Sequence, residues 1–130
     1  MTAAAIGAAL LLAGVAVFQA ALALGVPWGQ MAYGGRVETT EGVLPDRYRA
    51  MGASAVFILP FAAWMILARA DVVDEWFWSD GFVRTAAWVV AGYMVLNTVM
   101  NATARTSAER WGMGSATAIT ALLSFVVAAG

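Results

Sequence analysis

The chain has 130 residues, of which 62% are hydrophobic and only 12% are charged, and its net charge is −1. This composition is typical of a membrane protein, and the length predicts a single domain. The sequence has no Cys, His or Lys, which excludes disulfides, a histidine-ligated haem, a Cys/His zinc site and a Schiff-base lysine. It also has no polybasic run, so we expect no nucleic-acid partner. We expect no cofactor.

Long uncharged stretches separate the few groups of charged residues. Charged side chains are absent before Arg36, after Arg110, and from two internal stretches of 19 and 20 residues, 50–68 and 85–104. A helix needs about 20 apolar residues to cross the hydrocarbon core of a membrane, where its backbone must satisfy its own hydrogen bonds. We predict an all-α fold, a four-transmembrane-helix bundle in one integral membrane domain over residues 1–130, with helices at about 3–26, 47–68, 82–104 and 107–128.

The first apolar stretch, 3–26, is interpreted as a retained membrane helix. It lacks the basic n-region of a signal peptide, and its apolar run is longer than a typical h-region. Gly7, Gly14 and Ala21 recur every seven residues and predict a seam along which another helix can approach closely. For Gln19, the strongly polar side chain of this helix, an interhelical hydrogen bond is favoured over a role in a pore.

The stretch that follows, "PWGQMAYGGRVETTEGVLPDR", is rich in Gly and Pro and predicts an ordered loop between the first two helices. Trp28 is expected at the membrane interface. Between the second and third helices, "RADVVDEWFWSDG" is interpreted as an interfacial aromatic turn with a solvated acidic face, because its acidic spacing does not match a calcium loop.

The distribution of arginines predicts the orientation of the chain. Five arginines lie in the connections that join helices 1–2 and 3–4, and Arg69 and Arg84 flank the connection between helices 2 and 3. The positive-inside rule then places both termini outside. We expect a multi-pass protein of the bacterial inner (cytoplasmic) membrane.

Polar residues recur every four positions along the third helix. Tyr93, Asn97, Asn101 and Arg105 therefore share one face, and the asparagines must point into the bundle to find partners. Interhelical hydrogen bonds to Gln19, Ser54 or the hydroxyls of helix 4 are the favoured interpretation. The alternative is a binding cavity or ion path in which Arg105 holds an anionic group.

Glu109 seems to continue this series but has its own interpretation. Thr106-Ser107-Ala108-Glu109 matches a capping box at the start of the last helix, in which the carboxylate reaches back to the cap N–H. All other acidic residues lie in loops or at helix ends, so no mid-membrane acid is available as the proton carrier of a small multidrug exporter.

The motifs "GVPWGQMAYGG…GVLPDRYR" and "LNTVMNATARTSAER" resemble those of a group of small uncharacterised bacterial four-helix integral membrane proteins. The resemblance implies a four-helix inner-membrane fold. It brings no activity and no catalytic residues.

The first functional hypothesis is a non-enzymatic protein with a polar intramembrane cavity that binds or passes a small molecule, lipid or ion. Its partners would be membrane lipid and either further copies of the chain, in a homo-oligomer, or other membrane subunits. An accessory subunit of a larger membrane complex, docked through helices 1 and 4, is the alternative. A lipid-phase enzyme using the loop carboxylates Glu38, Glu41 and Asp46 is less favoured. The predicted ligand-binding residues are Trp28, Arg36, Arg49, Tyr93, Asn97, Asn101 and Arg105.

Overall fold

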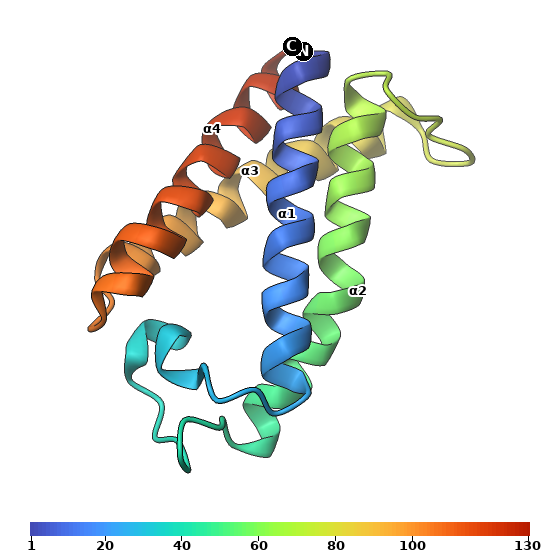
Figure 1. Ribbon diagram of the computed structural model, residues 1–130. Coiled ribbons are helices and arrows are strands. Elements are labelled where there is room, and N and C mark those ends of the chain that lie inside the picture. The colour runs from blue at the N-terminus through green and yellow to red at the C-terminus, as the bar shows by residue number, and fades with distance from the viewer.

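A computed structural model describes all 130 residues and confirms an all-α bundle of four long helices (Figure 1). Each helix is 22 to 24 residues long and apolar enough to cross a membrane, because a rise of about 1.5 Å per residue carries it across the hydrocarbon core. The chain is therefore a four-span integral membrane protein in contact with lipid. The helices are α1 (Thr2–Ala23), α2 (Asp46–Arg69), α3 (Asp80–Ala102) and a final helix that begins as the π-helical segment Ala108–Met113 and continues as α4 (Gly114–Ala129).

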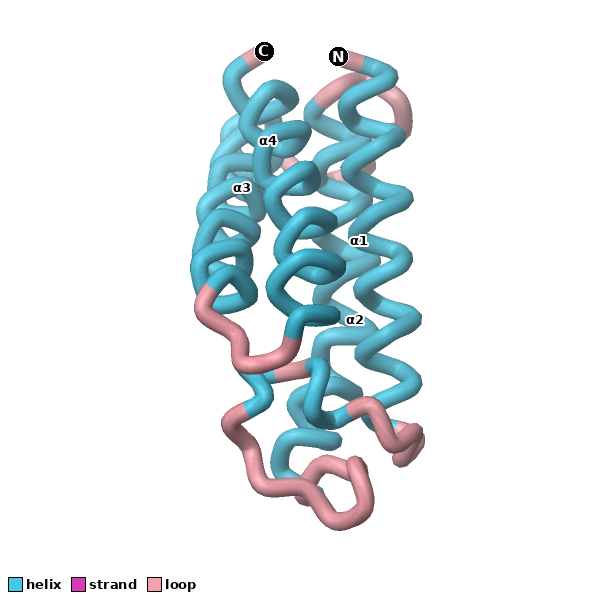
Figure 2. The backbone as a smooth tube through the Cα atoms, turned by 60° about the vertical axis from the view of Figure 1, so that its left-hand side comes forward, coloured by secondary structure: helices cyan, strands magenta, loops and turns pink.

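The four helices form two antiparallel pairs. α1 packs mainly against α2 and α3 mainly against α4, and contacts between α1 and α4 join the two pairs (Figure 2). Both termini lie at one end of the bundle. The α1–α2 connection, residues 24–45 (loop 1), and the α3–α4 turn lie at the other end, which we call the loop 1 end (Figures 1 and 2).

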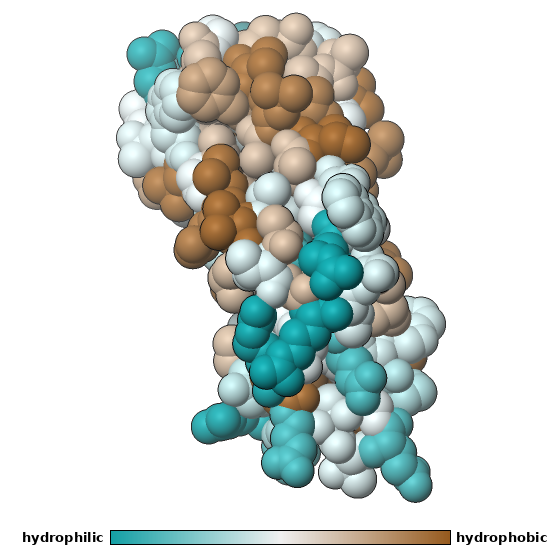
Figure 3. All heavy atoms as spheres, turned by 90° about the vertical axis from the view of Figure 1, so that its left-hand side faces the viewer, coloured by the Kyte–Doolittle hydropathy of each residue, from teal (hydrophilic) through white to brown (hydrophobic).

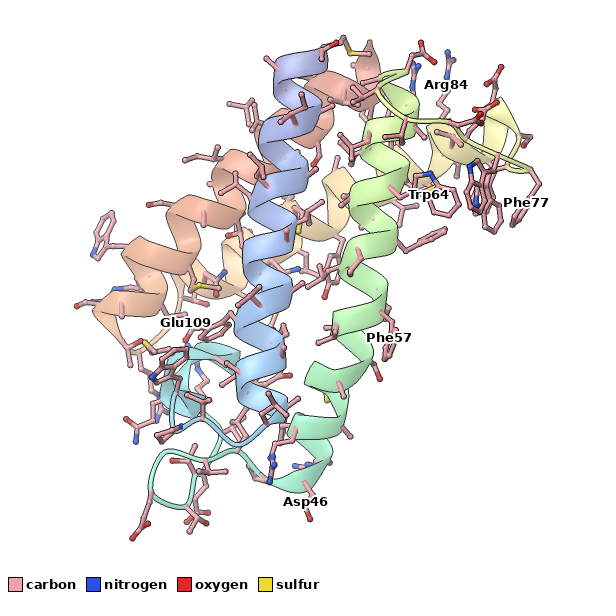
Figure 4. All side chains as sticks on the ribbon, turned by 45° about the vertical axis from the view of Figure 1, so that its right-hand side comes forward. Asp46, Phe57, Trp64, Phe77, Arg84 and Glu109 are labelled. Atoms are coloured by element: carbon pink, nitrogen blue, oxygen red, sulfur yellow. The ribbon has the colours of Figure 1, made fainter.

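Small and large apolar residues alternate in the packed centre. Ala5 and Ala8 of α1 are fully buried beside Ile66 of α2 and Val127 of α4. Small side chains allow the close helix approach that stabilises bundles in lipid. The outward faces carry large exposed apolar residues such as Phe57, which points away from α2 in Figure 4 and is 80% exposed without lipid.

Gly25 explains why α1 ends at Ala23 rather than near residue 26. Its φ of +93° is left-handed, a conformation that glycine adopts without steric cost. Gly25 N donates to the Leu22 carbonyl and Val26 N to the Ala21 carbonyl, the pair of bonds that defines a Schellman motif. The third helix also ends early, at Ala102 rather than near residue 104.

Loop 1 is folded back onto the α3–α4 turn. Gly34 O accepts a hydrogen bond from Arg105 N at 2.9 Å, and the Arg36 guanidinium donates to the Thr103 carbonyl. A small apolar cluster of Leu22, Ala32 and Leu44 holds the loop against α1. The predicted ordered loop is thus present, and it covers this end of the bundle.

The α2–α3 connection carries the predicted aromatic turn. Trp64 of α2 contacts Trp76 and Trp78 of the turn at centroid distances of 5.6 and 6.3 Å, and its Nε1 donates to the Asp74 carbonyl at 3.0 Å. Figure 4 shows Phe77 projecting from this turn, on the termini side of the molecule.

Candidate ligand-binding cavity

A cavity of about 330 Å³ lies between the four helices and loop 1. Its lining comes from the second half of α1, the part of α2 from Met51 to Leu59, the second half of α3 and the start of the last helix, so it extends from the middle of the bundle to loop 1. The apolar part of the wall includes five of the seven methionines of the chain. The polar side chains that line it are Gln19, Tyr33, Tyr93, Asn97, Asn101, Glu109 and Thr117.

Glu109 is the one buried acidic residue of the chain, only 2% exposed. Its Oε1 accepts a hydrogen bond from the backbone N–H of Gly34 at 3.0 Å. Its Oε2 is buried and has no hydrogen-bond partner in the protein. In Figure 4 Glu109 lies at the end of the last helix that meets loop 1. A buried carboxylate oxygen without a partner is costly, which sets this residue apart from an ordinary structural acid.

The predicted capping box is only half formed. Thr106 Oγ1 accepts from Glu109 N at 3.3 Å, as a cap does. The carboxylate, however, does not turn back to the cap, because loop 1 presents the Gly34 amide to it. Gly34 can do so because its φ is +74° and the residue is buried against the turn. The half of the capping box that Thr106 supplies is therefore confirmed, and the half that the Glu109 carboxylate was expected to supply is wrong.

The two asparagines of α3 line the cavity in different ways. Asn101 Nδ2 donates to Thr117 Oγ1 of α4 at 3.3 Å, which confirms the predicted hydrogen bond to a helix 4 hydroxyl. Asn97 Nδ2 instead donates to the Tyr93 carbonyl of its own helix at 2.9 Å. Asn97 is thus a cavity residue that does not hold two helices together.

Tyr33 lies where the cavity meets loop 1. Burial raises the pKa of its phenol, and the nearby phenols of Tyr93 and Tyr48 raise it further. Tyr33 therefore stays neutral at physiological pH and offers an O–H donor as well as an acceptor oxygen. Its own φ of 53° is left-handed, which is uncommon for a residue other than glycine and frequent at functional sites.

The other predicted site residues lie outside this cavity. Trp28 stacks on Phe18 at a centroid distance of 6.3 Å, and Arg49 Nε donates to the Ala23 carbonyl at 3.1 Å. Arg36 lines a separate, open hollow of loop 1. Arg105 is exposed and follows the end of α3, so it does not continue the helix face.

The structure thus brings together three predicted residues and adds others. Tyr93, Asn97 and Asn101 share the cavity, as their spacing on one helix face implies. The additions are Tyr33, Glu109, Thr117 and the amide of Gln19, the strongly polar side chain of α1. No sequence pattern links Tyr33 to the α3 face, whereas Glu109 continues the four-residue series of that face although it lies on the last helix.

The chain matches no known family, no curated protein and no solved structure at a significant level. The four membrane spans and the cavity consequently rest on this chain's own sequence and structure.

Proposed function

We propose that this four-span membrane protein is a non-enzymatic binding protein that holds a small ligand in the cavity at the loop 1 end. The observation that carries the proposal is the buried, half-satisfied carboxylate of Glu109 in a cavity shared with Asn97 and Asn101. Polar groups inside a membrane bundle cost free energy unless they find partners, and ionisable ones commonly mark a ligand or ion site. A bound ligand supplies the missing partner.

The position of the cavity favours binding over passage through the membrane. The cavity is lined by loop 1 and by helix residues that lie from the middle of the bundle to the loop 1 end. In the other half, Ala5, Ala8, Ile66 and Val127 pack together with no exposed surface. Between this core and the cavity lies a second hollow of about 470 Å³, which shares Leu59, Tyr93 and Met94 with the cavity. Twelve of its 13 lining residues are hydrophobic and none is charged or an amide, so the polar wall of the cavity does not continue across the bundle.

The accessory-subunit and lipid-phase-enzyme alternatives have less support. Gly7, the first residue of the predicted docking seam, faces α4 of the same chain, where an added Cβ would lie 3.1 Å from Leu123 Cδ1. That part of the seam is used within the bundle rather than kept for another subunit. Glu38, Glu41 and Asp46, the residues proposed for a lipid-phase enzyme, are exposed on the surface of loop 1 and the start of α2.

We also infer that the loop 1 end faces the cytoplasm of a bacterial inner membrane, with both termini outside. The five arginines of this end support the orientation, because cytoplasmic connections carry the excess of positive charge. The choice of a bacterial membrane rests on the loop motifs described in the sequence analysis.

Native mass spectrometry of the gently extracted protein tests the proposed function. Wild-type protein is expected to carry a bound small molecule above the 13.6 kDa mass of the chain. Asn97→Leu is expected to lose it, because leucine makes this wall of the cavity apolar without breaking an interhelical hydrogen bond. The matched control is Ser54→Ala, which removes a polar group that likewise bonds only to its own helix but lies outside the cavity.

Retention of the ligand by Asn97→Leu, or a wild-type protein that carries no ligand, contradicts the proposal. The same spectra report the number of copies and any other subunit. A stoichiometric partner chain with no small molecule would support the accessory-subunit alternative instead.

A further inference from the structure

The unpartnered oxygen of Glu109 determines which ligand chemistry suits the cavity. Oε1 is occupied by the Gly34 amide, while Oε2 has no donor within the protein. A carboxyl group in an apolar bundle is stabilised either by a cation beside its ionised form or by protonation, which removes the charge. An anion in the same cavity would be repelled by Glu109.

Arg36 does not fill the vacant position beside this carboxylate. Its guanidinium donates to the Thr103 carbonyl, and its side chain is exposed and lines the separate hollow of loop 1. Arg105, the residue that the sequence suggested for holding an anion, lies outside the cavity. The cavity itself therefore contains one acidic group and no basic group.

The rest of the wall suits an apolar body that carries one positive charge. Phe18, Tyr33 and Tyr93 bring aromatic rings to the cavity, and such rings attract cations through their faces. The methionines supply flexible, polarizable side chains that adapt to an irregular ligand. A volume of about 330 Å³ is at the lower end of the range for small-molecule sites.

The geometry points to a small organic cation, a protonated amine with an apolar or aromatic body, as the ligand class of this cavity. The inference rests on the proposed function and deepens it. The ammonium group lies beside the carboxylate of Glu109, which lines the cavity, the phenol of Tyr33 and the amides of Asn97 and Gln19 orient it, and the apolar body packs against the methionines.

A matched pair of probes tests the inference on the full-length protein in detergent or lipid nanodiscs. Benzylammonium and benzyl alcohol have nearly the same shape and differ in charge. Isothermal titration calorimetry is expected to show benzylammonium binding at least tenfold more tightly, a difference of about 1.4 kcal/mol. Equal affinities, or no binding of benzylammonium, overturn the inference.

Glu109→Gln shows whether this carboxylate is the source of the preference. Glutamine keeps the size of the side chain and an acceptor for the Gly34 amide but removes the charge. Glu109→Gln is expected to bind the two probes with about equal affinity, because benzylammonium binds more weakly than to the wild type while benzyl alcohol binds as before. Glu38→Gln, on the exposed surface of loop 1, is the matched control and keeps the preference.

A preference that survives in folded Glu109→Gln overturns the inference. If this variant does not fold, the wild-type ratio of the two affinities decides. Different results contradict the proposed binding function and the proposed cation site. A wild-type protein that carries a neutral or anionic molecule in native mass spectrometry contradicts the cation site and leaves the binding function standing, whereas a protein without any ligand contradicts the binding function.

Discussion

At the scale of single residues, the site depends on an unusual backbone conformation at the contact between Gly34 and Glu109. These residues are 75 positions apart, and they meet because Tyr33, Gly34 and Gly35 all adopt left-handed φ values. Such a conformation turns the Gly34 N–H toward the last helix and its carbonyl toward Arg105. One glycine thus fixes loop 1 to both sides of the α3–α4 turn.

Gly34→Ala is expected to lower the free energy of unfolding by about 1–2 kcal/mol, because a Cβ is disfavoured at a left-handed φ. The Arg36 guanidinium, which lies beside the new methyl group, is the end of a flexible side chain and can move aside. Gly92→Ala is the control: its added Cβ meets nothing within 4 Å, and alanine in a helix gains up to about 1 kcal/mol over glycine. Thermal unfolding followed by tryptophan fluorescence measures both, and an unchanged midpoint for Gly34→Ala would contradict the role of the left-handed turn.

At the scale of elements, the sequence was sufficient for the four helices because membrane spans leave a strong signal in uncharged runs. Helix ends were less predictable, since they depend on local backbone bonds. Gly25 ends α1 through a Schellman motif, and α3 ends at Ala102. That early end removes Arg105 from the α3 face and so from the cavity.

The candidate site was predictable only where its residues share one helix. The four-residue spacing placed Tyr93, Asn97 and Asn101 on a common face, and the structure has them in one cavity. Glu109 was assigned to a cap because the local pattern Thr106–Glu109 is complete in itself. The competing partner, the Gly34 amide, becomes available only when loop 1 folds under the bundle, and this tertiary contact leaves no periodic signal in the sequence.

At the scale of the whole molecule, the protein has two dissimilar ends. The termini end has the main apolar core and, between α1, α2 and α3, a hollow lined almost wholly by hydrophobic residues, while the loop 1 end has the polar cavity and most of the arginines. On the face drawn in Figure 3, hydrophobic side chains dominate the upper part, and most hydrophilic ones gather toward the loop 1 end. This asymmetry suits a protein whose ligand enters from one side.

Reporter fusions test the inferred orientation. Alkaline phosphatase fused after Gly130 is expected to be active, because it folds only outside the cytoplasm and the arginine-rich end is expected inside. The same enzyme fused after Thr106, in the α3–α4 turn, is expected to be inactive and serves as the matched control. The reverse pattern of activities would contradict the orientation.

The most direct measurement of the central claim is an amide NMR titration of the full-length protein with benzylammonium. The Gly34 N–H donates to Glu109, and the side-chain amides of Asn97 and Asn101 line the same cavity, so these signals report on it directly. We expect the largest chemical-shift changes to fall on these three groups and to saturate together. Shifts confined to the lipid-facing surface, or no saturable shift at Gly34, would contradict it.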